Sequence, residues 1–361
     1  ARLSGDECTV VLEDITSAQD AEDIAQHIIT AFMQPLSFGE RLELSVSPSI
    51  GISLYPDHAQ VPTDLLKHAD TAMYQAKAAG RHTYQLYSES MDEKTRHRAI
   101  LASALRRALE RNELSLVYQP RLSLKQQRIT GVEALLRWQS KEFGEVSPGQ
   151  FIPLAEESGL ILEIGAWALR EALQTLRSWH AQDFPDLTVA VNVSAMQLQR
   201  GDLADVVART LGETGVAAGF LELELTESVI MANPEKNADT LRACRRLGVF
   251  IAIDDFGTGY SSLAYLKRLP LTTLKIDQEF VSDLTHDVDD EAITSTIINM
   301  GHSLSLNVIA EGVETAAQLQ FLHDHGCDEI QGHWISHALT PEACLQFIRE
   351  HGLRPAIKAA S

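Results

Sequence analysis

Eight short strand-like runs between residue 114 and about residue 336 limit the fold more than any other feature of the sequence. Most of them are separated by segments of helix length, such as those at about 161–183 and 289–305. The runs read LSLVYQP, ITGVEALLRW, TVAVNVS, LELELT, VFIAID, TTLKID, NVIAEGV and DEIQG. Strands that alternate with helices predict a parallel sheet with right-handed crossovers. Eight of them over roughly 250 residues predict an α/β fold with a closed, TIM-like (β/α)₈ barrel, and a doubly wound open sheet is the alternative.

The first two runs are expected to be an exception to the parallel order. Only a short polar stretch, Lys125-Gln126-Gln127-Arg128, separates them. Because a parallel crossover needs about a dozen residues, this pair is predicted to form an antiparallel hairpin. The barrel should therefore contain one antiparallel strand.

Each run carries a polar residue at or near its C-terminal end, which is the end of a barrel where active sites form. In chain order these residues are Gln119, Glu133, Asn192, Glu224, Asp254, Lys275, Glu311 and Gln331. Side chains alternate between the two faces of a strand, so Glu222 and Glu224 should point inward between outward leucines, as should Lys275. The alternative is a set of half-exposed strands with solvated polar faces. This alternative explains one such strand more easily than eight strands in order with a polar residue at the same end.

Five carboxylates, those of Glu133, Glu224, Asp254, Asp255 and Glu311, would crowd into this barrel mouth. Two like charges ~4 Å apart repel by about 4 kcal/mol at an effective dielectric constant of ~20, so the cluster calls for cations. Oxygen ligands suit Mg²⁺ or Mn²⁺. Adjacent carboxylates such as Asp254 and Asp255 can splay to two sides and allow Asp254 to bridge two ions, a common arrangement for phosphodiester hydrolysis.

Two further charges of the predicted barrel interior need partners. Lys275 would orient the attacking water or stabilise developing negative charge, or it would form a structural ion pair with a carboxylate, and the two roles are compatible. Glu222 would lie one layer deeper than Glu224, where an unpaired charge is costly. A basic or hydrogen-bonding partner is expected for Glu222, although the sequence does not identify it.

The ordered motifs of residues 99–350 resemble the EAL-domain phosphodiesterases. The name-giving motif stands as Glu133-Ala134-Leu135. The others are YQP at 118–120, FIPLAEESGLI at 151–161, NVS at 192–194, ELTES at 224–228, DDFGTGYSSL at 254–263, LKID at 274–277, AEGVET at 310–315 and QG at 331–332. After this QG the sequence departs from the usual family pattern, at His333 and Trp334, a difference that bears on base stacking and affinity.

The resemblance implies hydrolysis of cyclic di-GMP to linear pGpG with two Mg²⁺ or Mn²⁺ ions. It implies that Glu133, Asn192, Glu224, Asp254, Asp255 and Glu311 are metal ligands and that Lys275 positions the attacking water. It places Gln119, Arg137, Glu314 and Gln331 where the family contacts the substrate or supports the site. Arg137 also fits chemically, because a guanidinium fork matches phosphate oxygens, with a surface salt bridge as its alternative.

The stretch that begins Phe256-Gly257-Thr258-Gly259 resembles the family loop that couples the metal site to dimerisation, and Glu227 matches the glutamate that supports it. The resemblance therefore implies a homodimer through the EAL domain. The other interpretation is a turn that caps the following helix, and the two are compatible. Two glycines would allow unusual backbone angles there.

The N-terminal segment, about 1–87, resembles the C-terminal half of a GGDEF domain, the fold of the diguanylate cyclases. Its signature stands as Ser4-Gly5-Asp6-Glu7-Cys8, and SIGISLYPD and ADTAMYQAKAAGRH follow at 49–57 and 69–82. We therefore expect a fragment of a GGDEF–EAL tandem protein, with a partial GGDEF domain at 1–87, a linker at 88–98 that begins a helix ending near Asn112, and an EAL domain at 99–361. The segment is either a regulatory remnant or, in an intact protein, a site for GTP.

Composition narrows the remaining functional classes. A formal net charge of −20 argues against binding to polymeric nucleic acid or anionic membranes, although metal ions would still admit an anionic substrate. The four cysteines form no C-x-x-C pair, and the chain starts without a signal-peptide profile, so a cytoplasmic location is expected. A cyclic di-GMP receptor without catalysis, a cyclase-dominant protein and another metal-dependent barrel enzyme are the alternatives to a phosphodiesterase.

Overall fold

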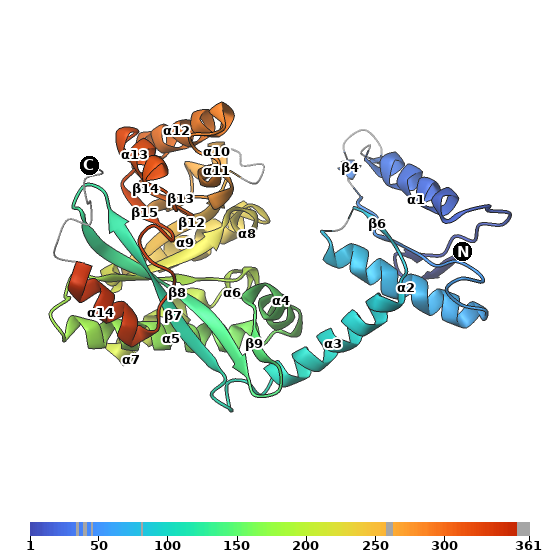
Figure 1. Cartoon of the computed structure of the whole chain (residues 1–361), viewed down its shortest axis with the longest axis horizontal. Coiled ribbons are helices and arrows are strands. Elements are labelled where there is room, and N and C mark those ends of the chain that lie inside the picture. Colours follow the sequence, from blue (N-terminus) through green and yellow to red (C-terminus); the bar gives the residue numbers. More distant parts are fainter. Residues whose placement is uncertain (34–35, 39–41, 45, 81, 258–262, 352–361) are drawn as a thin grey trace. The chain divides into compact units, whose positions relative to one another are not determined.

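The computed structural model of the chain describes residues 1–361 except 34–35, 39–41, 45, 81, 258–262 and 352–361. It divides into two compact units, Ala1–Leu101 and Ala102–Ser361, and Figure 1 labels the elements of each. No helix among the described residues is both long enough and apolar enough to cross a lipid bilayer.

The first unit is a small α/β assembly of short strands and helices. Its strands pair as β1 (Arg2–Ser4) with β2 (Glu7–Cys8), β3 (Leu36–Phe38) with β4 (Leu42–Leu44), and β5 (Ile50–Ile52) with β6 (Tyr84–Leu86). Its helices are α1 (Ala18–Phe32), α2 (Pro62–Ala78) and the start of α3 (Glu89–Leu105). The parallel strands β5 and β6 are joined through α2, which lies so close to β5 that a Cβ on Gly51 would be 1.9 Å from the carbonyl oxygen of Ala69.

Helix α3 ends earlier than the sequence pattern predicts. The α-helix stops at Leu105, and residues 106–112 form turns instead of continuing the helix to Asn112. Asn112 adopts a left-handed conformation with φ of 54°, which turns the chain into the first strand of the second unit.

The second unit contains a closed barrel of eight strands, as predicted (Figure 1). The strands are β7 (Leu114–Ser123), β8 (Arg128–Ser140), β10 (Thr188–Asn192), β11 (Leu221–Thr226), β12 (Phe250–Phe256), β13 (Thr273–Ile276), β14 (Asn307–Ala310) and β15 (Glu329–Gln331), and β9 (Gly144–Val146) pairs antiparallel with the end of β8. Strand β7 runs antiparallel to both β8 and β15, which confirms the predicted hairpin. Pairing of β10 with β8 closes the sheet and rules out the open alternative.

Helices follow most of the strands, and two of them match the expected segments at about 161–183 and 289–305. The helices are α4 (Pro148–Ser158), α5 (Ile161–His180), α6 (Ala195–Arg200), α7 (Leu203–Thr214), η1 (Ala218–Phe220), α8 (Glu227–Met231), α9 (Pro234–Leu247), α10 (Leu263–Leu266), α11 (Gln278–Ser282), α12 (Val288–Ser303), α13 (Ala316–Asp324) and α14 (Pro341–His351). The local sequence determines both ends of helix α4, because proline occupies its first turn and Gly159, with φ of 78°, ends it.

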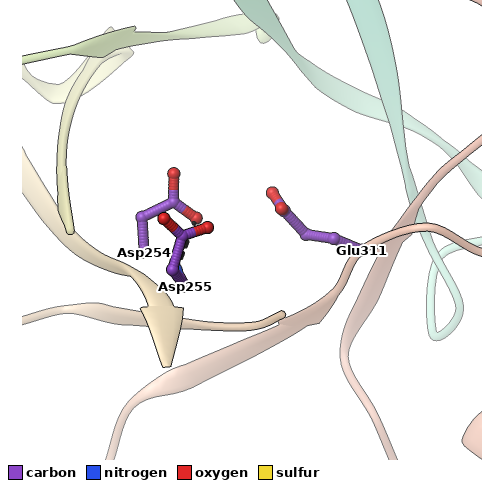
Figure 2. A group of neighbouring side chains, drawn as sticks. All are labelled: Asp254, Asp255 and Glu311. Carbon is purple, nitrogen blue, oxygen red and sulfur yellow. Dashed lines mark hydrogen bonds between the residues drawn. The ribbon is translucent and has the colours of Figure 1, made fainter. Parts of the chain in front are cut away.

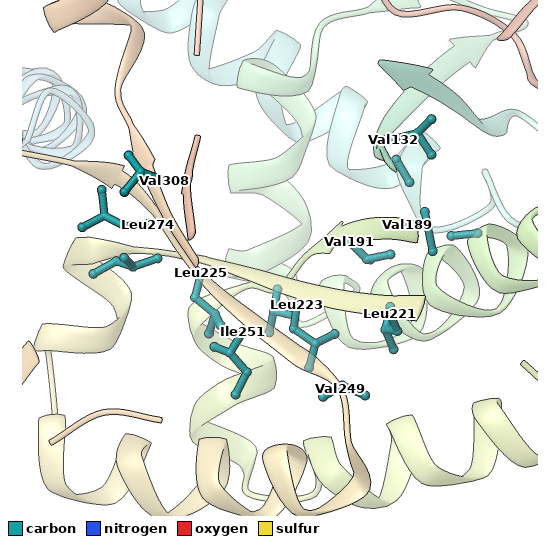
Figure 3. Packing of buried hydrophobic residues seen from close by; sticks show 14 of the residues in the cluster. Val132, Val189, Val191, Leu221, Leu223, Leu225, Val249, Ile251, Leu274 and Val308 are labelled. Carbon is teal, nitrogen blue, oxygen red and sulfur yellow. The ribbon is translucent and has the colours of Figure 1, made fainter. Parts of the chain in front are cut away.

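The hydrophobic core lies between the strands and these helices (Figure 3). Leu221, Leu223 and Leu225 of β11 and Leu274 of β13 are fully buried in it. Burial of each such side chain contributes about 1.5–3 kcal/mol. Because neighbouring residues of a strand face opposite sides, this packing directs Glu222, Glu224 and Lys275 into the barrel.

Candidate active site

A buried lysine lies among carboxylates at the C-terminal ends of the barrel strands. Lys275 of β13 is only 1% exposed. Its Nζ atom lies 2.5 Å from Glu311 Oε1, 2.8 Å from Glu224 Oε2, 3.1 Å from Asp254 Oδ1 and 3.6 Å from Glu133 Oε2. Five of the predicted strand-end residues therefore meet at one point, and the structural ion pair considered for Lys275 is present.

Glu133 is held in place by two amide side chains. Asn192 Nδ2 donates a 2.7 Å hydrogen bond to Glu133 Oε1, and Gln331 Nε2 donates a 2.6 Å hydrogen bond to Oε2. Gln331 also bonds Gln119 Oε1 at 3.1 Å, which brings two more predicted residues to the site. Burial alone would raise the pKa of Glu133, but Lys275 and the two amide donors outweigh it and lower the pKa. Glu133 is thus kept ionised.

Asp254 and Asp255 point to the same side of β12, whereas the sequence also allowed adjacent carboxylates to splay to two sides. Pairing of β12 with β13 shifts register between Ile253 and Phe256, and Asp255 has a φ of 52°. This bulge turns the Asp255 side chain toward its neighbour. Ligand oxygens of Asp254, Asp255 and Glu311 consequently all lie within 4.8 Å of one another (Figure 2).

Several of these carboxyl groups bind protons more tightly than usual. Burial, opposed by Lys275, raises the pKa of Glu311 to about 8. Burial together with the charge of Asp254 raises the pKa of Asp255 to about 6. The pKa of Glu224 is also raised, by burial first, and Glu224 has no amide donors like those on Glu133 among the described residues. The carboxylates of the cluster therefore carry more negative charge than Lys275, their main counterion, neutralises.

The donor set fits hard divalent cations. The six predicted ligands offer only carboxylate and amide oxygens, the ligands that Mg²⁺ and Mn²⁺ prefer. Glu224 is fully buried, and its Oε1 accepts no hydrogen bond in the described part of the chain, with Arg121 Nη1 3.6 Å away. Such an orphaned buried oxygen, next to carboxyl groups with raised pKa values, is expected where a cation binds.

Divalent metal should displace protons from this cluster, because it favours the charged form of each ligand. At pH 7 Glu311, with a pKa of about 8, is mostly protonated without metal, whereas Asp255, with a pKa of about 6, is mostly ionised. We expect Mn²⁺ binding at pH 7 to release about one proton from Glu311, together with any proton held by Glu224, and to release more at pH 5.5. Calorimetric titrations in buffers of different ionisation enthalpy measure this number, and a buffer-independent binding enthalpy at both pH values would contradict it.

Glu222 has the partners that the sequence required but did not identify. Arg121 of β7 forms a close ion pair with Glu222 Oε1, and Thr273 Oγ1 donates a 2.5 Å hydrogen bond to Oε2. Arg121 was missed by sequence reasoning, although strand alternation gives the signal. It lies two residues after Gln119, so both side chains face the barrel interior.

Arg137 and Glu314 lie apart from the carboxylate cluster. Arg137 is half-buried, and its Nη1 donates a 2.9 Å hydrogen bond to the carbonyl oxygen of Leu136. Glu314 is exposed, with Oε1 3.2 Å from Nδ1 of His333, one of the residues that departs from the family pattern. Among the described residues neither is hydrogen-bonded or ion-paired to the cluster.

The loop after β12 is tied to a buried glutamate. Glu227 is 2% exposed, and its Oε2 accepts a 3.0 Å hydrogen bond from the backbone N–H of Gly257. Gly257 has a φ of 107°, and a Cβ there would be 2.6 Å from the ring of Phe280, so glycine is required. Phe256 is buried in the core. Thr258 and Gly259 of the predicted loop lie outside the described residues.

Comparison with known families matches both units of the chain. The EAL domain family matches residues 102–338, and the family described as "Diguanylate cyclase, GGDEF domain" matches residues 1–83. Among curated proteins, the bifunctional diguanylate cyclase/cyclic di-GMP phosphodiesterase MucR of Pseudomonas aeruginosa is 43% identical over 345 residues, which are 96% of this chain and 50% of MucR. The cyclic di-GMP phosphodiesterase PdeR of Escherichia coli is 37% identical over 92% of this chain and 50% of PdeR.

Solved structures give the same relationship. The PaMucR phosphodiesterase in a c-di-GMP complex is 45% identical, with a TM-score of 0.66, and the match covers 68% of this chain and 99% of that one. The EAL domain of Mycobacterium smegmatis DcpA is 32% identical, with a TM-score of 0.58, over 67% of this chain and all of that one. The chain spans about half the length of the curated relatives it matches.

Proposed function

We propose, from the premise that this chain belongs to the EAL domain family, that it hydrolyses cyclic di-GMP to linear pGpG by a two-metal mechanism. The observation that carries the proposal is the set of five carboxylates and one buried lysine at a single barrel mouth. Relatives described as cyclic di-GMP phosphodiesterases support the choice of substrate. Activity of a longer protein that contains this chain is part of the same proposal.

Six residues would hold two Mg²⁺ or Mn²⁺ ions, namely Glu133, Asn192, Glu224, Asp254, Asp255 and Glu311. When bound, the ions would supply an activated water and neutralise charge on the phosphoryl oxygens. Asn192 and Gln331 would keep Glu133 oriented and ionised for this purpose. The raised pKa values mean that Glu311 would lose its proton when the site fills at pH 7, and that Asp255 would do so as well below its pKa of about 6.

Lys275 would take a direct part in the chemistry. Its ammonium group, which lies within 3.6 Å of four carboxylates, would orient the attacking water or stabilise charge that develops on the phosphate. Gln119, Arg137, Glu314 and Gln331 would contact the substrate or support the site. Among the described residues Arg137 and Glu314 make no hydrogen bond or ion pair to the cluster, so we assign them to parts of the substrate away from the scissile bond.

Incubation of the purified chain with cyclic di-GMP and Mg²⁺, followed by chromatography, tests the proposal. We expect pGpG to accumulate and a chelator to stop it, because the carboxylates cannot act on a polyanion without cations. Binding of cyclic di-GMP without any pGpG, also with fresh Mn²⁺, would instead identify the chain as a receptor, the second candidate function.

Other expectations stay predictions. A homodimer through the EAL domain, a GTP site in the GGDEF-type segment of a longer protein, a cytoplasmic location and the domain limits 1–87, 88–98 and 99–361 rest on the sequence alone. In the signature Ser4-Gly5-Asp6-Glu7-Cys8, Asp6 directly precedes β2 and Glu7 is its first residue, and both are exposed.

A further inference from the structure

A second buried ionic group lies one layer below the carboxylate cluster. Arg121, 3% exposed, extends from β7 into the barrel and contacts Glu222 Oε1 through Nη1. The same Nη1 lies 3.6 Å from Oε1 of Glu224. We call the layer that contains Arg121 and Glu222 the barrel floor. One guanidinium group therefore joins Glu222 of this floor to Glu224 of the proposed metal site.

A glycine leaves the space that this guanidinium occupies, in place of a side chain that could pack there. Gly131 of β8 is paired opposite Arg121, and a Cβ on it would lie 3.0 Å from Arg121 Nη2 and 2.4 Å from Thr188 Oγ1. Buried ion pairs are often no more stabilising than apolar residues of similar volume, because both charges lose their hydration. Stability alone is therefore a weak reason for an arginine in this position.

Glu222 is a rigid anchor for the guanidinium. Its Oε2 accepts a hydrogen bond from Thr273 Oγ1, and its Oε1 pairs with Arg121. Both of its oxygens are therefore committed within the floor, so Arg121 has a fixed position from which to act on Glu224.

Glu224 is held between two cations that approach different oxygens. Lys275 Nζ donates to Oε2 at 2.8 Å, and Arg121 lies on the side of Oε1. We propose that Arg121 is a positioning residue: anchored on Glu222, it fixes the orientation of the Glu224 carboxylate and thereby sets the affinity of the barrel mouth for divalent cations. The inference rests on the proposed function only in taking Glu224 as a metal ligand.

The double variant Arg121→Met/Glu222→Met tests this role without changing the net charge. It removes one positive and one negative group and replaces both with flexible apolar side chains, so neither Arg121 nor Glu222 is left as a buried charge without its partner. We expect the dissociation constant for Mn²⁺, measured by calorimetry without substrate, to rise 10–100-fold, the usual effect of losing a group that orients a metal ligand.

A purely electrostatic role predicts the opposite result. Arg121 lies 3.6 Å from Glu224 Oε1 and favours the charged form of that carboxylate, so loss of this positive charge should tighten the binding of a cation. Mn²⁺ binding that is unchanged or tighter in the double variant would overturn the proposal. The second readout is turnover at saturating Mn²⁺, where kcat should recover because Arg121 does not touch the reacting groups, and a kcat that stays low would also overturn it.

Two further variants distinguish the positioning of Glu224 by Arg121 from a general loss of packing in the barrel floor. Thr130→Val removes the 3.2 Å bond from Thr130 Oγ1 to Glu329 in the same floor and should leave the Mn²⁺ dissociation constant within about twofold. An equal loss in this control would contradict the proposal. Arg121→Lys keeps the charge beside Glu222 but lacks a fork, so it should fold and still weaken Mn²⁺ binding. Wild-type hydrolysis of cyclic di-GMP, assayed separately, shows whether a failure lies in the proposed function instead.

Discussion

Replacement of Lys275 by methionine is expected to reduce hydrolysis of cyclic di-GMP by about 10²–10³-fold, the usual cost of removing a pre-organised group that stabilises developing charge. Methionine keeps the length and apolar character of the lysine stem, and Leu274 and Ile276 on either side pack outward regardless. Chromatography for pGpG at saturating Mn²⁺ measures the loss. Near wild-type turnover would show that Lys275 is only a structural counterion.

The same substitution should affect metal binding in the opposite direction. Lys275 lies within 3.6 Å of four carboxylates, so its removal leaves their charges to repel one another and to attract cations more strongly. The metal-free variant should therefore melt at a lower temperature than wild type, and Mn²⁺ should raise its Tm by more. Lys236→Met, at an exposed lysine that bonds only the carbonyl oxygen of Gln199 among the described residues, is the matched control and should change neither property.

Much of the barrel could be predicted because its strands follow a simple pattern. The eight apolar runs, their helical separators and the short polar turn at 125–128 determine strand order and the antiparallel hairpin. Alternation of side chains correctly placed Glu224 and Lys275 inside. These predictions from period and spacing were confirmed, whereas the helix expected to end near Asn112 stops at Leu105.

The parts that failed depend on backbone geometry and on long-range contacts. Asp255 adopts a positive φ that aspartate tolerates but does not require, so the bulge that brings it beside Asp254 has no sequence signal. Arg121 and Glu222 are 101 positions apart in the chain, so their pairing depends on how the strands are arranged in the folded barrel. The protonation of Glu311 likewise follows from burial, a property of the folded barrel.

The largest loss is expected from Glu133→Gln, because this residue is the carboxylate that its surroundings keep most firmly ionised. The amide has nearly the same shape, so the change removes one negative charge with little change in volume. Loss of a charge contact worth about 4 kcal/mol, at ~4 Å and an effective dielectric constant of ~20, corresponds to roughly three orders of magnitude in turnover at a fixed Mg²⁺ concentration. Rates of pGpG formation over a series of Mg²⁺ concentrations measure it.

The hydrogen bonds of Glu133 make the outcome specific. Both oxygens of Glu133 accept from amide donors, so the new NH₂ group of glutamine would face a donor from Asn192 or Gln331 and force one of these amides to turn. Glu145→Gln, on the exposed edge strand β9 that pairs with β8, carries the same chemical change away from the barrel interior and should retain full turnover. If Glu133→Gln retained turnover at every Mg²⁺ concentration while Lys275→Met lost it, the chemistry would depend on the lysine and the remaining carboxylates, and Glu133 would not be a metal ligand.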